Sequence, residues 1–385
     1  MAETVFIPLE TFPGEGRIAA SPESVKKLKT LGFEVVVQAG AGTLSRMPDS
    51  EFEKAGARIG SAADAASADV VLKVRRPTSA EVTGYKSGAI VLAIMDPYGN
   101  DQALADMAKA GVSAFAMELM PRITRAQSMD VLSSQANLAG YQAVIEAASE
   151  YDRAMPMMMT AAGTVPAAKV FVMGAGVAGL QAIATARRLG AVVSATDVRP
   201  ASKEQVASLG AKFIAVEDEE FKAAETSGGY AKEMSADYKA KQAVLTAEHL
   251  AKQDIVITTA LIPGRPAPRL ITRDMLKAMK PGSIAVDLAV ERGGNVEGAV
   301  ADQVVEVEGV KVVGYTNMPG RIAASASALY AKNLVTFLET MVSKETKALA
   351  LNAEDELVKA TMLTHGGAVV HPNFAAEPVV VSATA

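Results

Sequence analysis

Cysteine and tryptophan are absent from the 385 residues, and only three histidines occur. Without cysteine the chain has no disulfides, no thiolate nucleophile and no Cys-ligated metal. The three histidines, His249, His365 and His371, are scattered without the spacing of metal ligands, so we expect no metal site. Aromatic residues make up only 5% of the chain although 50% of it is apolar. Small aliphatic residues supply most of that half, which is typical of close-packed α/β layers.

Long apolar runs and strong charge are also lacking. No unbroken apolar run approaches the roughly 20 residues that a membrane helix needs. The first residues, MAETVFIPLETF, lack a charged segment followed by an apolar core, so we expect no signal peptide and a soluble, cytoplasmic chain. A net charge of -5 gives no basic surface for nucleic acid, which we do not expect as a partner.

A glycine-rich turn between two apolar strands is the most informative feature. Residues 170–173 form a strand-type run, and Gly174, Gly176 and Gly179 follow as G-x-G-x-x-G at the start of a helical segment. In this pattern the first glycine allows a tight turn, the second lets the backbone approach a pyrophosphate, and the third allows close helix packing. The helix N-terminus then faces the diphosphate. The bland alternative is a tight βα turn that binds nothing.

An acid completes this pattern. Asp197 lies 18 positions after Gly179, at the end of the next apolar run. A carboxylate there accepts hydrogen bonds from both adenosine ribose hydroxyls and repels a 2′-phosphate, which favours NAD over NADP. Arg199 lies two residues further on and complicates this preference.

Strand and helix patterns alternate on both sides of the glycine turn. From VFIPL to VSAFAME they indicate a parallel sheet with helices on both faces, and a second such series starts at Lys169. Residues 131–152 predict a long bridging helix, and another long helix follows Asn317. We therefore predict an α/β protein of two Rossmann-like, doubly wound parallel-sheet domains joined by long helices, with a cleft between them. The expected domains are residues 1–133 plus 322–385, and residues 134–321.

Two polar segments have a functional and a plain interpretation. Residues 217–245, in a long connection, predict a mobile loop hinged at Gly228 and Gly229 and carrying Tyr230. An ordinary solvated helix-loop-helix is the alternative. The stretch LMPRITRAQSMD ends at Asp130, and its plain interpretation is a surface linker in which Asp130 caps the next helix.

Several stretches resemble a known family. They are MELMPRITRAQSMDVLSSQANLAGYQAVIEAA, PMMMTAAGTVPAAKVFVMGAGVAGLQAIATARRLGA, GGYAKEM, ITTALIPGRPAP and RIAASPE, which together span nearly the whole chain. They resemble the NAD(H)-binding component, domain I, of proton-translocating nicotinamide nucleotide transhydrogenase, in its separate α1-type form. Alanine dehydrogenase is a more distant relative with the same two-lobed fold.

The resemblance implies roles for individual residues. Arg122, Gln127 and Asp130 match the loop that holds the nicotinamide end and faces the partner domain, so they are the expected catalytic residues. Further cofactor contacts are expected at Ser133, Gly174, Ala175, Gly176, Val177, Gly179, Asp197, Val198, Arg199, Gly229, Tyr230, Gln242 and Leu261.

The resemblance also implies a mechanism and partners. NADH on this chain passes a hydride to NADP⁺ on a partner domain, and a separate membrane subunit couples the transfer to proton movement. Hydride transfer between two nicotinamides needs proximity and orientation without a general acid or base. Because one fingerprint is present, NADP(H) is expected on the partner only. The family also implies a homodimer attached peripherally to the membrane, and the VVEVEGVKVVGY hairpin is a candidate dimer contact.

An alanine dehydrogenase is the competing function. Arg17 and Lys73 match residues that hold the amino-acid substrate in those enzymes. Oxidative deamination also needs a positioned proton carrier. Asp96 stands where the dehydrogenases have a catalytic histidine, and Glu291 where they have a catalytic aspartate. We therefore favour the transhydrogenase component and interpret Arg17 and Lys73 as inherited or structural. A regulatory NAD-binding module without turnover is a third possibility.

Overall fold

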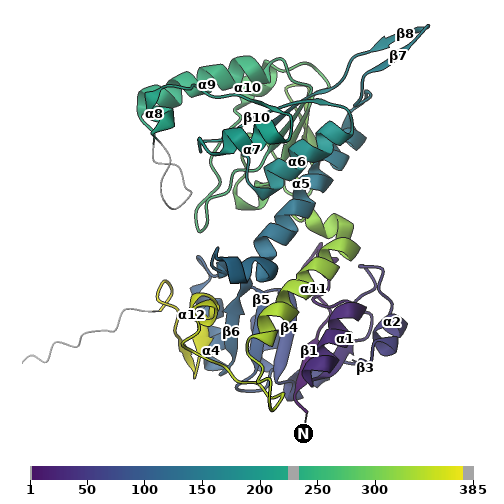
Figure 1. The fold of residues 1–385 in the computed structure, drawn as a ribbon, viewed down its shortest axis with the longest axis vertical. Helices are drawn as coiled ribbons and strands as arrows, with labels where there is room; N and C mark the ends of the chain where they lie inside the picture. The colour runs from purple at the N-terminus through teal and green to yellow at the C-terminus, as the bar shows by residue number, and fades with distance from the viewer. Residues whose placement is uncertain (1, 224–233, 376–385) are drawn as a thin grey trace, which may run out of the picture. The chain divides into compact units, whose positions relative to one another are not determined.

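The computed structural model describes residues 2–223 and 234–375 (Figure 1). The chain divides into two compact units: unit 1 is Met1–Gln135 with Gly320–Ala385, and unit 2 is Ala136–Pro319. Helix α5 (Val131–Glu150) runs across the first division. The short 3₁₀-helix η5 (Pro319–Ile322) spans the second. Within the described ranges no helix is both long and apolar enough to cross a membrane.

Unit 1 is built on a six-stranded parallel sheet in the order β3-β2-β1-β4-β5-β6. Its strands are β1 (Thr4–Ile7), β2 (Glu34–Gln38), β3 (Arg58–Gly60), β4 (Val70–Arg75), β5 (Ile90–Ile94) and β6 (Ser113–Ala116). Its helices are α1 (Pro22–Leu31), α2 (Asp49–Lys54), α3 (Ser79–Thr83), α4 (Asp101–Lys109), α11 (Ala323–Glu339) and α12 (Glu356–Thr361). A small hairpin pairs β16 (Thr364–His365) with β17 (Ala368–Val369).

The sheet of unit 1 is covered on both faces. Val5 packs in one core cluster together with Tyr330 and Leu334 of α11. The next residue, Phe6, packs in a second cluster with Leu104 of α4. Because successive side chains of a strand point to opposite faces, the two clusters lie on opposite sides of the sheet. This double burial explains why the strands are near-continuous apolar runs in the sequence.

Local signals set helix α1 as the sequence predicts. Ser21 caps its N-terminus through a reciprocal capping box with Ser24, and Pro22 occupies the first helical position. Gly32 ends it with φ 107°, a left-handed conformation that glycine adopts without a Cβ penalty.

Unit 2 carries a seven-stranded sheet in the order β11-β10-β9-β12-β13-β15-β14, parallel except for the antiparallel pair β14 and β15. The strands are β9 (Lys169–Met173), β10 (Val192–Thr196), β11 (Lys212–Phe213), β12 (Ile255–Thr258), β13 (Ile284–Asp287), β14 (Val304–Val307) and β15 (Val310–Val313). The helices are α6 (Val177–Arg188), α7 (Ser202–Ser208), α8 (Glu219–Lys222), α9 (Ala236–Leu250) and α10 (Arg273–Lys277). The order reverses at central strand β9, the switch point where doubly wound sheets bind ligands. The predicted β14–β15 hairpin is confirmed, and β14 is an edge strand.

Two segments of unit 2 add to the sequence prediction. The stretch 155–168, predicted only as a connector, contains an antiparallel hairpin of β7 (Met158–Thr160) and β8 (Gly163–Val165). It extends away from the rest of unit 2 (Figure 1). All six of its strand residues are exposed, so there was no alternation of apolar and polar residues to reveal the strands. Within residues 217–245, α8 and the beginning of α9 are helical. Gly228, Gly229 and Tyr230 lie outside the described residues.

Candidate functional site

The turn after β9 contains glycines of two kinds. Gly174 has φ 105°, and a Cβ there would lie 2.3 Å from Thr259 Oγ1. A Cβ on Gly179 would lie 1.8 Å from the carbonyl oxygen of Gly174. A Cβ on Gly176 would meet no heavy atom within 4 Å. Packing within the chain therefore accounts for Gly174 and Gly179 only, and the open space at Gly176 fits the close approach of a pyrophosphate.

Helix α6 begins directly at this turn. Gly176 is its N-cap and makes no side-chain capping bond, while Ala175 is buried and Val177 is exposed. The first-turn amides of the 12-residue helix therefore lack a side-chain acceptor, which leaves its positive end for an anionic ligand. Sequence reasoning missed Gly140 of α5, where a Cβ would lie 2.0 Å from the carbonyl oxygen of Ala178. Gly140 thus lets α5 pack tightly against the first turn of α6.

Asp197 is tied to the glycine turn. It follows β10, and its Oδ2 accepts the Ala175 amide at 2.7 Å. Oδ1 accepts the Arg199 amide and Nε, both at 2.9 Å, and Oδ2 also accepts a terminal guanidinium nitrogen of Arg199 at 3.0 Å. Burial opposes ionisation of Asp197, but these hydrogen bonds outweigh it and hold the pKa of the carboxyl below its usual range. Val198, between the two partners, is exposed.

Two further predicted contacts lie on neighbouring parts of unit 2. Gln242 of α9 accepts the Val216 amide at 2.9 Å and donates to Thr196 Oγ1 at 3.4 Å, which brings it beside the end of β10. Leu261 is exposed on the loop after β12. That loop is held by Asn295, a fully buried residue that pairs with both the amide and the carbonyl of Ala260, at 3.1 and 2.9 Å. No sequence pattern marks Asn295, because the bonds join residues far apart in the chain.

The loop with Arg122 and Gln127 lies in unit 1. Its 3₁₀-helix η3 (Thr124–Met129) buries Ala126 and Met129 in the core. Asn333 of α11 donates to the Ser128 carbonyl at 2.9 Å. The loop is therefore fixed on its inner side, and Arg122 and Gln127 are exposed on its surface.

Asp130 and Ser133 lie together at the start of α5. Asp130 Oδ1 accepts the Ser133 amide at 2.9 Å, and Oδ2 accepts the Ser133 hydroxyl at 2.5 Å. Asp130 therefore caps α5, the structural role that the plain interpretation of the loop assigns to it. Ser133 is held by the same pair of bonds.

The two cations that suggested an amino-acid site are buried in unit 1 and paired internally. Arg17 binds both oxygens of Glu15 at 2.7 Å, and Gln135 at 2.8 Å. Burial opposes ionisation of Glu15, but Arg17 outweighs it and lowers the pKa of the carboxyl to about 2. Lys73 lies 2.8 Å from a Glu81 oxygen and 3.5 Å from a Glu10 oxygen.

Asp96, at the position of the dehydrogenase histidine, follows the end of β5. It has φ 47°, and its amide donates to Glu118, which also accepts the Met95 amide at 3.1 Å. Burial raises the pKa of Glu118 to about 7. Glu291, at the position of the dehydrogenase aspartate, is exposed on η4 (Val290–Arg292).

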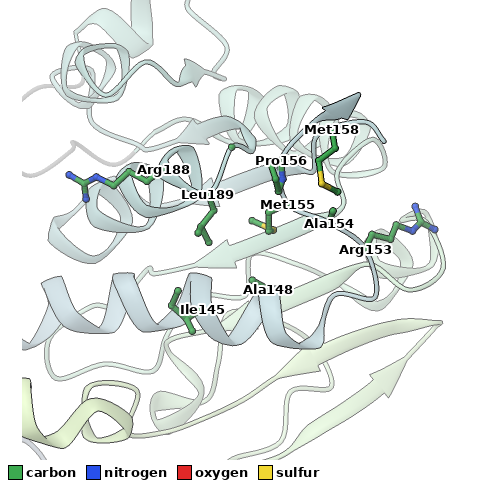
Figure 2. A pocket seen from close by; sticks show the side chains of 10 residues that line it. Ile145, Ala148, Arg153, Ala154, Met155, Pro156, Met158, Arg188 and Leu189 are labelled. Carbon is green, nitrogen blue, oxygen red and sulfur yellow. The ribbon is translucent and has the colours of Figure 1, made fainter. Parts of the chain in front are cut away.

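An apolar hollow of about 660 Å³ lies at the opposite end of α6 from the glycine turn. Figure 2 shows Ile145 and Ala148 of α5 across from Leu189, with Met155, Pro156 and Met158 beside them. Arg153 and Arg188 also line it. The hollow is therefore distinct from the predicted nucleotide site. Among the described residues no group of three or more His, Cys, Asp or Glu side chains is placed to hold a metal ion.

Comparison with known proteins identifies related chains. Residues 6–139 match the family description "Alanine dehydrogenase/PNT, N-terminal domain", and residues 143–372 match "Alanine dehydrogenase/PNT, C-terminal domain". A Rhodospirillum rubrum protein, the first of the separate chains that make up its NAD(P) transhydrogenase subunit alpha, is 57% identical over 375 residues, covering 96% of this chain and 98% of its own. A solved structure of transhydrogenase from Sinorhizobium meliloti is 74% identical, covers 96% of this chain and 100% of its own, and superposes with a TM-score of 0.89. Alanine dehydrogenase 1 of Staphylococcus aureus is 29% identical over 357 residues and covers 88% of each chain.

Proposed function

Because the chain belongs to the alanine dehydrogenase/PNT family and is similar over nearly its whole length to transhydrogenase alpha subunits, we propose that it is the NAD(H)-binding component of a proton-translocating transhydrogenase. It binds NADH and presents the nicotinamide to NADP⁺ held on a partner domain. A membrane subunit of the same assembly couples the transfer to proton movement. The chain itself then lies on the cytoplasmic side, attached to the membrane through these partners.

The observation that carries this proposal is the open space at Gly176 beside Asp197. The helix N-terminus and the free side of Gly176 suit a pyrophosphate, and the carboxylate of Asp197 suits the adenosine ribose. Bound NADH supplies the hydride, and the residues of this chain supply position. Gln242 and Leu261 are proposed to add contacts along the same edge of the sheet. Gly229 and Tyr230 are proposed to close over the nucleotide.

Arg122, Gln127, Asp130 and Ser133 are proposed to serve the nicotinamide end. Asp130 and Ser133 fix the start of α5, while Arg122 and Gln127 remain exposed for contact with the coenzyme and the partner domain. Hydride transfer gains from such positioning because holding two reactants in register removes much of the entropic barrier. No proton carrier is required in that step.

The geometry of unit 1 does not favour an amino-acid dehydrogenase. A substrate carboxylate would have to compete with Glu15 for Arg17 and with Glu81 for Lys73. Glu118, the buried carboxyl with a raised pKa, is directed to the backbone amides of Met95 and Asp96. We therefore expect no alanine oxidation by this chain.

Reconstitution with the partner tests the proposal. Purified chain is titrated with NADH and NADPH by nicotinamide fluorescence and then mixed with a purified NADP(H)-binding transhydrogenase domain. The proposal expects NADH to bind much more tightly than NADPH, and reduction of an NAD analogue by NADPH only when both proteins are present. Alanine-dependent NAD⁺ reduction by the chain alone would instead support the dehydrogenase. Nucleotide binding without transfer in the mixture would support a regulatory module.

We also propose that the chain is a homodimer, with the β7–β8 hairpin as the contact. Met157 and Met159 are 62% and 74% exposed, which is unfavourable for apolar side chains in water. The apolar hollow lies at the base of the hairpin on the same unit, so two copies can exchange hairpins through one self-complementary interface. The Met157→Asp, Met159→Asp double variant should be monomeric by light scattering. A variant that remains dimeric would return the contact to the edge strand β14.

A further inference from the structure

Arg199 fills the part of Asp197 that a ribose would use. We propose that the Arg199 side chain is a displaceable occupant of the adenosine-ribose subsite, and that its departure is a step of coenzyme binding that limits NADH affinity. The inference rests on the proposed function, since it assumes that the glycine turn binds NAD(H). It concerns a side chain that the sequence left ambiguous.

The hydrogen bonds at Asp197 fall into two sets. The backbone amides of Ala175 and Arg199 each donate to one carboxylate oxygen, at 2.7 and 2.9 Å. The guanidinium also donates once to each oxygen, at 2.9 and 3.0 Å. Because a carboxylate has about four lone-pair positions, all of them are taken in this arrangement.

A ribose diol needs the same two positions that the guanidinium holds. Its two hydroxyls donate one hydrogen bond to each oxygen of such an acid. The backbone amides belong to the turn and to the strand end, so they stay in place when the ligand binds. The guanidinium is the group that can leave, because the Arg199 side chain is 32% exposed whereas that of Asp197 is only 7% exposed. A released Arg199 side chain can be hydrated at the surface.

The exchange has a predictable effect on affinity and selectivity. Removing the guanidinium spares NADH the cost of breaking a partly exposed ion pair, so binding should tighten about fivefold. NADPH would gain nothing, because its 2′-phosphate has no donor for Asp197, is repelled by it, and would lose Arg199 as a cation. Arg199→Ala should therefore widen the preference for NADH over NADPH.

Nucleotide titrations of matched variants test this inference. The set is wild type, Arg199→Ala and Arg199→Lys, with Arg273→Ala as the control because Arg273 is also a surface arginine of unit 2 in an ion pair, with Glu308. Fluorescence titration with NADH should give about fivefold tighter binding for Arg199→Ala, an intermediate gain for Arg199→Lys, and no change for Arg273→Ala. Reduced nicotinamide mononucleotide lacks the adenosine ribose, so its affinity should be the same for all four proteins.

The outcomes separate this inference from the proposed function. If wild type fails to bind NADH, the proposed function is wrong and the inference falls with it. If wild type binds NADH but Arg199→Ala binds it equally or more weakly, Arg199 is not a competitor and only the inference is overturned. A gain that also appears with the mononucleotide would place the effect outside the ribose subsite and overturn it as well. Should Arg199→Ala fold poorly by circular dichroism, the Arg199→Lys titration decides.

Discussion

A Cβ atom on Gly179 would lie 1.8 Å from the carbonyl oxygen of Gly174, a distance that no packing adjustment of side chains can relieve. Gly176, three residues earlier in the same motif, faces open space. Two glycines of one sequence pattern are therefore required for different reasons. Gly179 serves the fold, and Gly176 is proposed to serve the ligand.

Alanine substitutions at these two glycines should separate stability from binding. Gly179→Ala should lower the free energy of unfolding by about 2–4 kcal/mol, because the methyl group meets backbone and forces α6 away from β9. Gly176→Ala should change it by less than about 1 kcal/mol, since the backbone at φ -74° accepts alanine. The same variant should weaken NADH binding at least about tenfold, because the methyl group occupies the place of the pyrophosphate. Urea unfolding and NADH titration provide both measurements. Normal NADH affinity in Gly176→Ala would show that the turn does not hold the diphosphate.

Local sequence signals explain how much of this site could be predicted. The glycine fingerprint and Asp197 lie within one strand-turn-helix-strand unit, so spacing along the chain was enough to place them together. The Gly140 approach to Ala178 and the Asn295 bonds to Ala260 depend on how distant segments pack, and no periodicity encodes them. The β7–β8 hairpin was missed because its exposed strands carry no buried face. The sequence also could not tell that Arg199 turns back onto Asp197, because a rotamer is chosen by the folded surroundings.

Gln127 should matter for transfer more than for binding. Its side chain is exposed on a loop that Met129 and Asn333 fix in unit 1. Gln127→Asn keeps the amide but shortens its reach by about one bond, enough to disturb a near-attack geometry. We expect NADH affinity to stay within about twofold while the hydride-transfer rate with the partner domain falls at least about tenfold. Stopped-flow transfer with an NAD analogue measures the rate. Gln102→Asn, on exposed α4, is the control. Equal rates in the two variants would reduce the loop to a linker.

Glu118 should make stability depend on pH. Burial raises its pKa from the ordinary 4.5 to about 7, so the folded chain binds this proton more tightly than the unfolded chain does. The stabilising contribution is therefore complete below about pH 4.5 and is lost as the pH rises through about 7, a change of roughly 2–3 kcal/mol. Glu118→Gln cannot ionise and should lose this part of the pH slope. The exposed Glu345→Gln should keep the wild-type slope. Urea unfolding between pH 5 and pH 8 measures all three proteins, and parallel curves would mean that Glu118 titrates normally.

Asn295 should control both the stability of unit 2 and the loop that carries Leu261. Its side chain is fully buried, holds the amide and carbonyl of Ala260, and donates to the Pro268 carbonyl at 2.8 Å. Asn295→Ala removes the partners of three backbone groups and should lower the free energy of unfolding by about 2–4 kcal/mol. Because the freed loop no longer holds Leu261 in place, NADH should also bind several-fold more weakly. Asn295→Asp keeps the acceptor for the Ala260 amide but loses both donated bonds, so its stability should lie closer to Asn295→Ala than to wild type. The exposed Asn352→Ala is the control for unfolding. If Asn295→Ala unfolded like that control, the loop would be held by its other contacts and Asn295 would have no special role.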